Sequence, residues 1–219
     1  MYFSGGDYEI ERSLRFNDGD SAYLSKTFGS AGDQRTFTFS FWSKFCISSS
    51  HSPVFSGNGS SGFFKFQFRS DGRIEVNTAE GGSDSSQVIT TRKFRDPSAW
   101  YHIVVAYDTT QGTSSNRVKI YVDGTQETDF DTNTLPSQNH QTCVNTDQDH
   151  EVGGRSSTSN YFDGYLADVY FISGSQLTPS SFGETHALTG QWVPAKYSGS
   201  YGTNGFFLKF ADNSNTTAA

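Results

Sequence analysis

Aromatic and β-branched side chains alternate with polar ones along much of this chain, and this pattern restricts the fold more than any other feature. Phenylalanine alternates with polar residues at 37–41 and 64–69, and valine and isoleucine alternate with lysine and tyrosine at 118–122. Successive side chains of a β-strand point to opposite faces, so each segment has one apolar and one polar face. Residues 100–107 and 165–172 are largely apolar on both faces, which is typical of central strands.

Turn signals separate these segments. Asp-Gly pairs stand at 71–72, 123–124 and 163–164, and this dipeptide tolerates the positive φ angles of tight hairpin turns. Residues 48–61 and 81–86 are rich in serine and glycine, which indicates surface loops. About ten short strands with such punctuation predict an all-β fold made of two facing antiparallel sheets.

The composition weakens any helical interpretation. The chain has 20 phenylalanines and 11 tyrosines but one methionine, and aromatic residues favour pleated surfaces. The single helical signal is a short turn at residues 178–182, where Thr178 is a candidate cap and Pro179 stands at the first helical position.

Charge and hydropathy exclude several classes of partner. The net charge is −7, with no long run of either sign, whereas nucleic-acid-binding proteins usually show a basic stripe. The acidity also disfavours anionic membrane surfaces, and no apolar run approaches membrane-spanning length. Residues 1–7 lack the basic and apolar regions of a signal peptide. We therefore expect no nucleic-acid partner and no membrane insertion. If the protein leaves its cell, we expect another route, such as release inside a particle.

The chain has two cysteines, Cys46 and Cys143, too few for a disulfide scaffold. Both lie in predicted sheet regions far apart in the sequence, so they could pair. Two reduced, partly buried thiols are the plainer interpretation, since free cysteine is usually buried as a small hydrophobe.

Several stretches occur together in a characteristic order: SLRFNDGDSAYL at 13–24, FTFSFWSK at 37–44, WYHIVVAYD at 100–108, VKIYVDG at 118–124, VGGR at 152–155 and YFDGYLADVY at 161–170. Together they resemble the laminin-G-like branch of the concanavalin A-like lectin/glucanase jelly rolls. The resemblance implies a two-sheet antiparallel jelly-roll sandwich. We expect an N-terminal arm at 1–10, the sandwich at 11–185 and an irregular C-terminal extension at 186–219.

The extension loses regular alternation, although residues 206–210 are strand-like and residues 212–219 are polar without a pattern. We expect the native polypeptide to continue beyond Ala219, or the tail to join a partner. The stretch from Phe182 to Phe206 is similar to a form of this domain found in virion proteins of marine bacteriophages, typically tail, fibre or appendage proteins. That resemblance implies a structural or host-recognition role in a virion, with other virion proteins or copies of the chain as partners.

No catalytic residues are predicted. The glucanases of this superfamily use a Glu-x-Asp-x-x-Glu motif, which the chain lacks, and the pair Glu9 and Glu11 has none of the remaining parts. His102 lies in a predicted central strand, so we expect a hydrogen-bonded core histidine. The other histidines stand in loop-like contexts without a nucleophile motif.

Two segments place oxygen ligands at alternate positions, as a calcium loop begins: residues 129–133 and 145–151. Thr134 and His150 stand where such a loop needs glycine, which favours solvated acidic loops instead. No cofactor is certain. The family resemblance implies a possible Ca²⁺ site at a sandwich edge that uses Asp18 or Asp20.

Carbohydrate binding usually needs aromatic platforms beside polar groups. Tyr121 projects to the polar face of its predicted strand, while Trp192, Tyr197 and Tyr201 lie in the extension. These four residues are the predicted ligand-binding set. Alternatively, they cover the sheet edge or seal a subunit interface.

The leading hypothesis is a non-catalytic virion structural protein that presents a binding surface for assembly and host recognition, including a host-surface glycan. The second is a carbohydrate-binding, lectin-like module of a bacterial surface protein. A polysaccharide-degrading glycosidase is the third.

Overall fold

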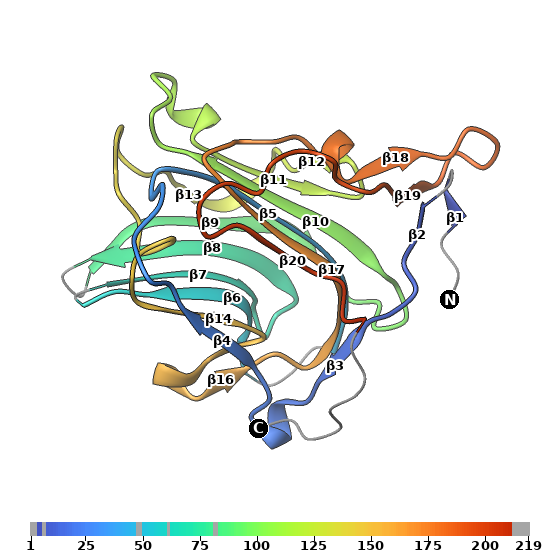
Figure 1. Ribbon diagram of the computed structural model, residues 1–219, viewed down its shortest axis with the longest axis horizontal. Helices are drawn as coiled ribbons and strands as arrows, with labels where there is room; N and C mark the ends of the chain where they lie inside the picture. Colours follow the sequence, from blue (N-terminus) through green and yellow to red (C-terminus); the bar gives the residue numbers. More distant parts are fainter. Residues whose placement is uncertain (1–3, 6–7, 47–49, 61, 81–82, 212–219) are drawn as a thin grey trace.

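The computed structural model describes residues 4–5, 8–46, 50–60, 62–80 and 83–211. Two seven-stranded antiparallel sheets pack face to face, which confirms the predicted all-β sandwich (Figure 1). Within the described ranges the helices are four single 3₁₀ turns, and none is long or apolar enough to cross a bilayer.

Sheet 1 has the predicted central strands at its middle. Its order is β12 (Thr125–Gln126), β11 (Val118–Val122), β10 (Tyr101–Asp108), β5 (Thr36–Phe45), β17 (Gly164–Ser173) and β20 (Phe206–Leu208). Strand β3 (Leu14–Phe16) pairs with the first part of β17, and β20 pairs with its later part. Both short strands therefore extend the sheet beyond β17, one after the other.

Sheet 2 contains several strands that the sequence pattern missed. Its order is β13 (Phe130–Thr134), β9 (Ser83–Lys93), β8 (Arg73–Glu80), β7 (Gly62–Phe68), β6 (Ser52–Asn58), β14 (Asp149–Val152) and β4 (Leu24–Thr27). The prediction of loops was wrong at 52–58 and 83–86. The solvated acidic loops expected at 129–133 and 145–151 also contain strands, β13 and β14, and β14 buries His150 and Glu151. Strand β6 is paired on both sides, by β7 and β14, and buries Val54 and Phe55, so tertiary pairing overrides the local serine and glycine signal.

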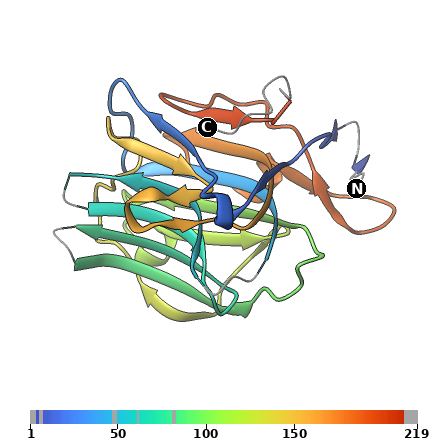
Figure 2. The ribbon, with the colours of Figure 1, turned by 90° about the horizontal axis from the view of Figure 1, so that it is seen from below.

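Short elements complete the fold. They are β1 (Ser4–Gly5), β2 (Tyr8–Glu9), β15 (Gly154–Arg155), β16 (Asn160–Tyr161), β18 (Gly183–Thr185), β19 (Trp192–Pro194), η1 (Asp18–Asp20), η2 (Ser114–Asn116), η3 (Ser156–Thr158) and η4 (Pro179–Ser181). The predicted helical turn is confirmed as η4, with proline at its start; the Thr178 side chain makes no capping hydrogen bond there. Figure 2 shows the first described residues on the same side as the β18–β19 hairpin, and β1 lies beside β19.

Paired phenylalanine rings fill the space between the sheets. Residues of β5 face residues of sheet 2: Phe39 stacks on Phe55 with ring centroids 4.6 Å apart, and Phe45 stacks on Phe68 at 3.8 Å. Burying one such ring contributes about 1.5–3 kcal/mol, and stacked or edge-on pairs add to that. The alternation read from the sequence therefore marks the core face correctly.

The outer face of sheet 1 carries a second apolar cluster. It consists of Val104, Ala106, Tyr121, Tyr170, Ile172 and Phe182, with Leu177, Tyr197, Tyr201 and Phe207 packed against them. The chain after β17 runs over this face and ends in β20 at the sheet edge (Figure 1). The region expected to be irregular thus supplies strands β19 and β20, the latter within the predicted strand-like run; residues 212–219 lie outside the described residues.

Both cysteines are free thiols, so the pairing alternative was wrong. Cys46 is exposed and Cys143 half-buried, and the expectation of partial burial therefore holds for Cys143 alone.

Candidate functional site

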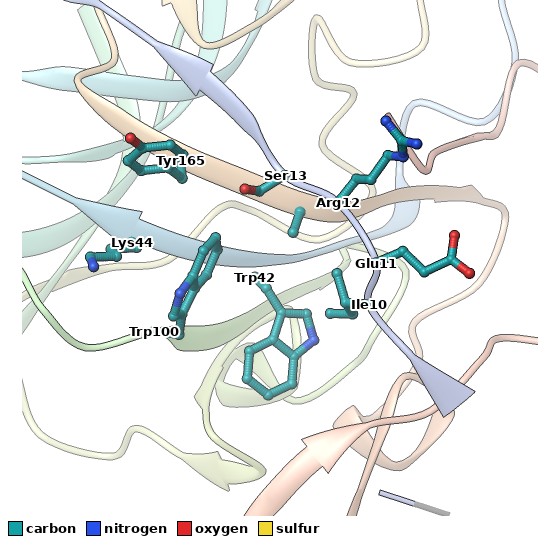
Figure 3. Close-up of a pocket in the computed structure, with 9 residues that line it drawn as sticks. Ile10, Glu11, Arg12, Ser13, Trp42, Lys44, Trp100 and Tyr165 are labelled. Carbon is teal, nitrogen blue, oxygen red and sulfur yellow. The ribbon is translucent and has the colours of Figure 1, made fainter. Parts of the chain in front are cut away.

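A groove of about 330 Å³ remains where the outer face of sheet 1 is not covered by the C-terminal segment (Figure 3). It is lined by Ile10, Glu11, Arg12, Ser13, Trp42, Lys44, Trp100, Tyr165 and Ala167. One wall comes from the N-terminal arm, and the floor comes from β5, β17 and the residue before β10. Aromatic, cationic and hydroxyl groups therefore meet in one depression.

Strand register places cations and aromatic rings alternately along this groove. Tyr165 on β17 stands opposite Arg15 of β3 on one side and opposite Lys44 of β5 on the other. Trp100 directly precedes Tyr101, whose partner on β5 is the neighbour of Lys44. Four segments distant in sequence thus form one row of Arg15, Tyr165, Lys44 and Trp100, which we call the cation–aromatic row.

The two rings of the row are available to a ligand. The centroids of Trp100 and Tyr165 lie 6.5 Å apart with planes inclined by 53°, and Tyr165 is 39% exposed. The Arg15 guanidinium lies 5.4 Å from the centre of the Tyr165 ring and forms a 2.6 Å ion pair with Asp163. This contact fixes Tyr165 from one side and leaves the side toward Trp100 open.

A stack of buried rings forms the inner boundary of the groove. Trp42 packs on His102 with ring centroids 5.0 Å apart, and His102 packs on Trp192 at 6.0 Å. The Trp192 indole N–H donates to Nδ1 of His102 at 2.9 Å, so Nε2 carries the proton and donates to the Ser40 hydroxyl. Burial lowers the pKa of His102 to about 3, and the ring is neutral. The expected hydrogen-bonded core histidine is confirmed.

The arm that forms the outer wall is attached at two points. The Tyr8 hydroxyl donates to a carboxylate oxygen of Asp168 at 2.7 Å, and the Lys209 ammonium lies 3.5 Å from the Glu11 carboxylate. Asp168 sits at a bulge of β17 with φ 44° and is buried. Burial raises its pKa to about 6, although the bond from Tyr8 opposes the rise.

The four residues predicted to bind a ligand do not line this groove. Tyr121 is 9% exposed, because the polar face expected for it is instead covered by the apolar cluster that includes Tyr197 and Tyr201. Trp192 is held between Gly124 and Gly183, where an added Cβ would come within 2.6 Å of its indole. These aromatics attach the C-terminal segment to sheet 1, and their role in ligand binding stays a prediction.

The possible calcium ligands are held locally. Asp18 and Asp20 belong to η1, where the Asn17 amide donates to the Asp20 carboxylate at 2.6 Å. Within the described parts of the chain, no three His, Cys, Asp or Glu side chains gather as a metal site would require. The predicted Ca²⁺ site stays a prediction.

The buried carboxylates of sheet 2 are unsuited to glycoside cleavage. Glu75 on β8 accepts from Gln67, Arg69 and Gln87 at 2.8–3.0 Å, and Glu151 on β14 accepts from the backbone and hydroxyl of Ser156. Three strand spacings separate β8 from β14, which amounts to about 14 Å. The two catalytic carboxyl groups lie about 5 Å apart in retaining glycoside hydrolases and at most about 9.5 Å apart in inverting ones, so this separation is too large for either class.

Two packed antiparallel sheets of this kind define a jelly-roll β-sandwich, a class that includes lectin domains. The family model described as the concanavalin A-like lectin/glucanases superfamily matches residues 17–181. The chain belongs to that superfamily, and the resemblance noted in the sequence is confirmed at this level. Among curated protein sequences, none matches the chain significantly.

Solved structures share the fold at low sequence identity. A heptameric SAP-like pentraxin from Limulus polyphemus is 16% identical, with a TM-score of 0.51 over 81% of this chain and 76% of that one. Domain 4 of the Geobacillus stearothermophilus arabinanase AbnA, solved with arabinotriose, is 16% identical, with a TM-score of 0.53 over 82% and 77%. The mouse laminin α1 LG4-5 structure is 11% identical, with a TM-score of 0.54 over 89% of this chain and 47% of that one. This chain therefore spans about half of the laminin fragment.

His102 should make folding sensitive to acid. Because the folded-state pKa is about 3 and the ordinary value is 6.5, the unfolded chain binds the proton first as the pH falls. The stability that neutral His102 contributes is fully present above pH 6.5. Between pH 6.5 and pH 3 the free energy of unfolding falls by about 1.4 kcal/mol for each pH unit. Urea unfolding of the protein and of His102→Gln between pH 7 and 4 should show a flatter pH dependence for the variant. A constant difference between the two at every pH would contradict this account.

Removal of the Tyr8 hydroxyl should loosen the arm. Tyr8→Phe removes the hydroxyl that donates to the buried Asp168 carboxylate. A hydrogen bond to a charged group contributes about 1.5–3 kcal/mol of stability, so the attachment of the arm should weaken by that amount. We expect trypsin to cut at Arg12 about tenfold faster or more, as followed by mass spectrometry. Tyr23→Phe is the matched control, since Tyr23 packs on Tyr161 away from the arm. Equal cleavage rates in both variants would show that the Tyr8 bond does not hold the arm.

Proposed function

We propose that this chain is a non-catalytic binding module that takes a glycan in the groove on the outer face of sheet 1. The observation that carries the proposal is the cation–aromatic row, where Trp100 and Tyr165 flank Lys44 at the surface. Aromatic rings offer an apolar face to the C–H side of a sugar ring, while cations and hydroxyls bond its oxygens. The groove supplies both kinds of contact, together with the Ser13 hydroxyl.

The pattern of carboxylates supports binding rather than hydrolysis. Among the described residues, Glu11 is the one carboxylate that lines the groove, and it is ion-paired with Lys209. A glycosidase needs a second carboxyl group across the scissile bond. The fold is also shared with a domain that was solved with arabinotriose, which supports a saccharide ligand without identifying it.

Trp100→Ala and Tyr165→Ala test the groove directly. Each removes one ring of the row. Stacking of a nucleic-acid base on such a ring contributes about 1–3 kcal/mol, and for a sugar ring of similar size we expect affinity to fall about tenfold or more. Binding is measured on a glycan array and then by calorimetry with the glycans that bind. Tyr23→Ala, which removes an exposed tyrosine outside the groove, should leave affinity unchanged. Undiminished binding by both groove variants, or no glycan bound by the protein, would refute the proposal.

The biological setting that we propose is a bacteriophage particle, as a module of a tail, fibre or capsid appendage. The similarity of the segment from Phe182 to Phe206 to marine phage virion proteins supports this setting. In such a particle, the module would bind a host-surface glycan and contact other virion proteins or copies of itself. A bacterial surface protein with the same glycan-binding module is the alternative.

Mass spectrometry tests this setting on phage particles that are purified from a lysate of cells infected by a phage whose genome encodes this chain. Peptides of the chain should sediment with the particles at a constant ratio to the capsid protein through repeated density gradients. Peptides of the chain that stay with host envelope material would favour the surface-protein alternative. If the peptides disappear from the particle fraction during repeated gradients, the chain is not part of the virion.

A further inference from the structure

The charges around the groove are unevenly compensated. Glu11 is paired with Lys209, and Arg15 is paired with Asp163. Arg12 and Lys44 also line the groove, and within the described residues neither forms an ion pair. The lining thus carries two positive charges without a direct ion-pair partner among the described residues, although the whole protein has a net charge of −7.

Lys44 occupies the central position of the row. It stands directly opposite Tyr165, while Trp100 flanks it on the side of β10. Figure 3 shows the Lys44 side chain beside Trp100 and Tyr165. The residue is half-buried, and lysine usually buries its aliphatic stem while it keeps the ammonium group in water.

Asp96 is a carboxylate that interacts electrostatically with Lys44, and one of its oxygens is engaged by Ser98. The charge of Lys44 contributes to lowering the pKa of Asp96, but the main cause is the hydrogen bond from the Ser98 hydroxyl. One oxygen of Asp96 accepts from both the hydroxyl and the backbone N–H of Ser98, at 2.5 and 2.8 Å. Asp96 and Lys44 form no direct ion pair, so the carboxylate acts on the lysine charge only at longer range.

Deepening the proposed function, on which this step rests, we infer that the groove selects a saccharide that bears a negatively charged substituent, and that Lys44 is the residue that selects it. A sugar ring stacked on Trp100 or Tyr165 presents its substituents beside the Lys44 ammonium. Charge-assisted hydrogen bonds are roughly twice as strong as neutral ones. On an otherwise acidic protein, the local positive potential also draws an anionic chain to this groove and away from the remaining surface. Arg12 at the rim adds a second contact.

A carboxylate and a sulfate would satisfy the same ammonium group, and the experiment separates them. Calorimetry compares oligogalacturonate with its carboxyl-reduced form, and a sulfated galactan with its desulfated form. We expect at least one anionic form to bind about tenfold tighter or more than its neutral counterpart, and the preferred pair names the substituent. Raising the salt from 50 to 500 mM should weaken binding of the anionic form and leave the neutral form nearly unchanged.

Lys44→Gln should abolish the preference without abolishing neutral binding. The matched control is Lys93→Gln, an exposed lysine at the end of β9 in the other sheet, which should keep the full preference. If Lys44→Gln weakens anionic and neutral forms equally, Lys44 acts through packing and the inference is overturned.

The result also separates this inference from the proposed function. Equal affinity for anionic and neutral forms, with Trp100→Ala abolishing both, would overturn charge selection and leave the groove as a glycan site. Binding that Trp100→Ala and Tyr165→Ala do not affect would overturn the proposed function itself.

Discussion

Sheet 1 is apolar on both faces, and the arrangement of the rest of the molecule follows from that. Its inner face completes the phenylalanine core, so its outer face would expose Val104, Tyr170 and Ile172 unless something covered it. The segment after β17 provides the cover: Phe207 stacks on Tyr170 with ring centroids 4.2 Å apart and planes nearly parallel at 2°. Removing such rings from water contributes far more free energy than the few hydrogen bonds that accompany them. The C-terminal segment is therefore bound as part of the sandwich, and the groove is the area that neither it nor the arm covers.

One irregularity in β17 links that cover to the groove. The register between β17 and β5 shifts between Ala167 and Tyr170, and Asp168 takes a positive φ of 44° at the shift. Asparagine and aspartate tolerate this conformation better than most residues, and a bulge of this kind lets the strand re-aim its side chains. Ala167, which is small, lines the groove floor, while Asp168 binds the tyrosine that attaches the arm. The same short stretch thus leaves space for a ligand and holds the wall beside it.

The sequence predicted the sheets better than it predicted the site. Alternation located the phenylalanine-rich strands β5 and β7 because burial on one face imposes a period of two on the chain. It failed at β6, where Ser52, Gly57 and Asn58 resemble a loop although both strand edges are paired. The cation–aromatic row was out of reach for a different reason. Trp100 and Tyr165 both belong to stretches that the family resemblance used, but their proximity depends on the register of β10, β5 and β17, which no local pattern encodes.

Trp100 and Trp192 show how differently two tryptophans can be placed in a chain so rich in aromatics. Trp192 looked like a platform because it stands in an irregular segment, yet its N–H bonds His102 and its ring fits against two glycines. These contacts hold the half-buried indole against the protein, and the role of Trp192 in ligand binding stays a prediction. Trp100 looked like the start of a core strand, yet it lies where the cover ends, in a groove that a partly exposed tyrosine and a lysine also line. Function on a shared fold is set by such differences in surroundings, because the fold fixes where a surface lies and the side chains at its uncovered part decide what it binds.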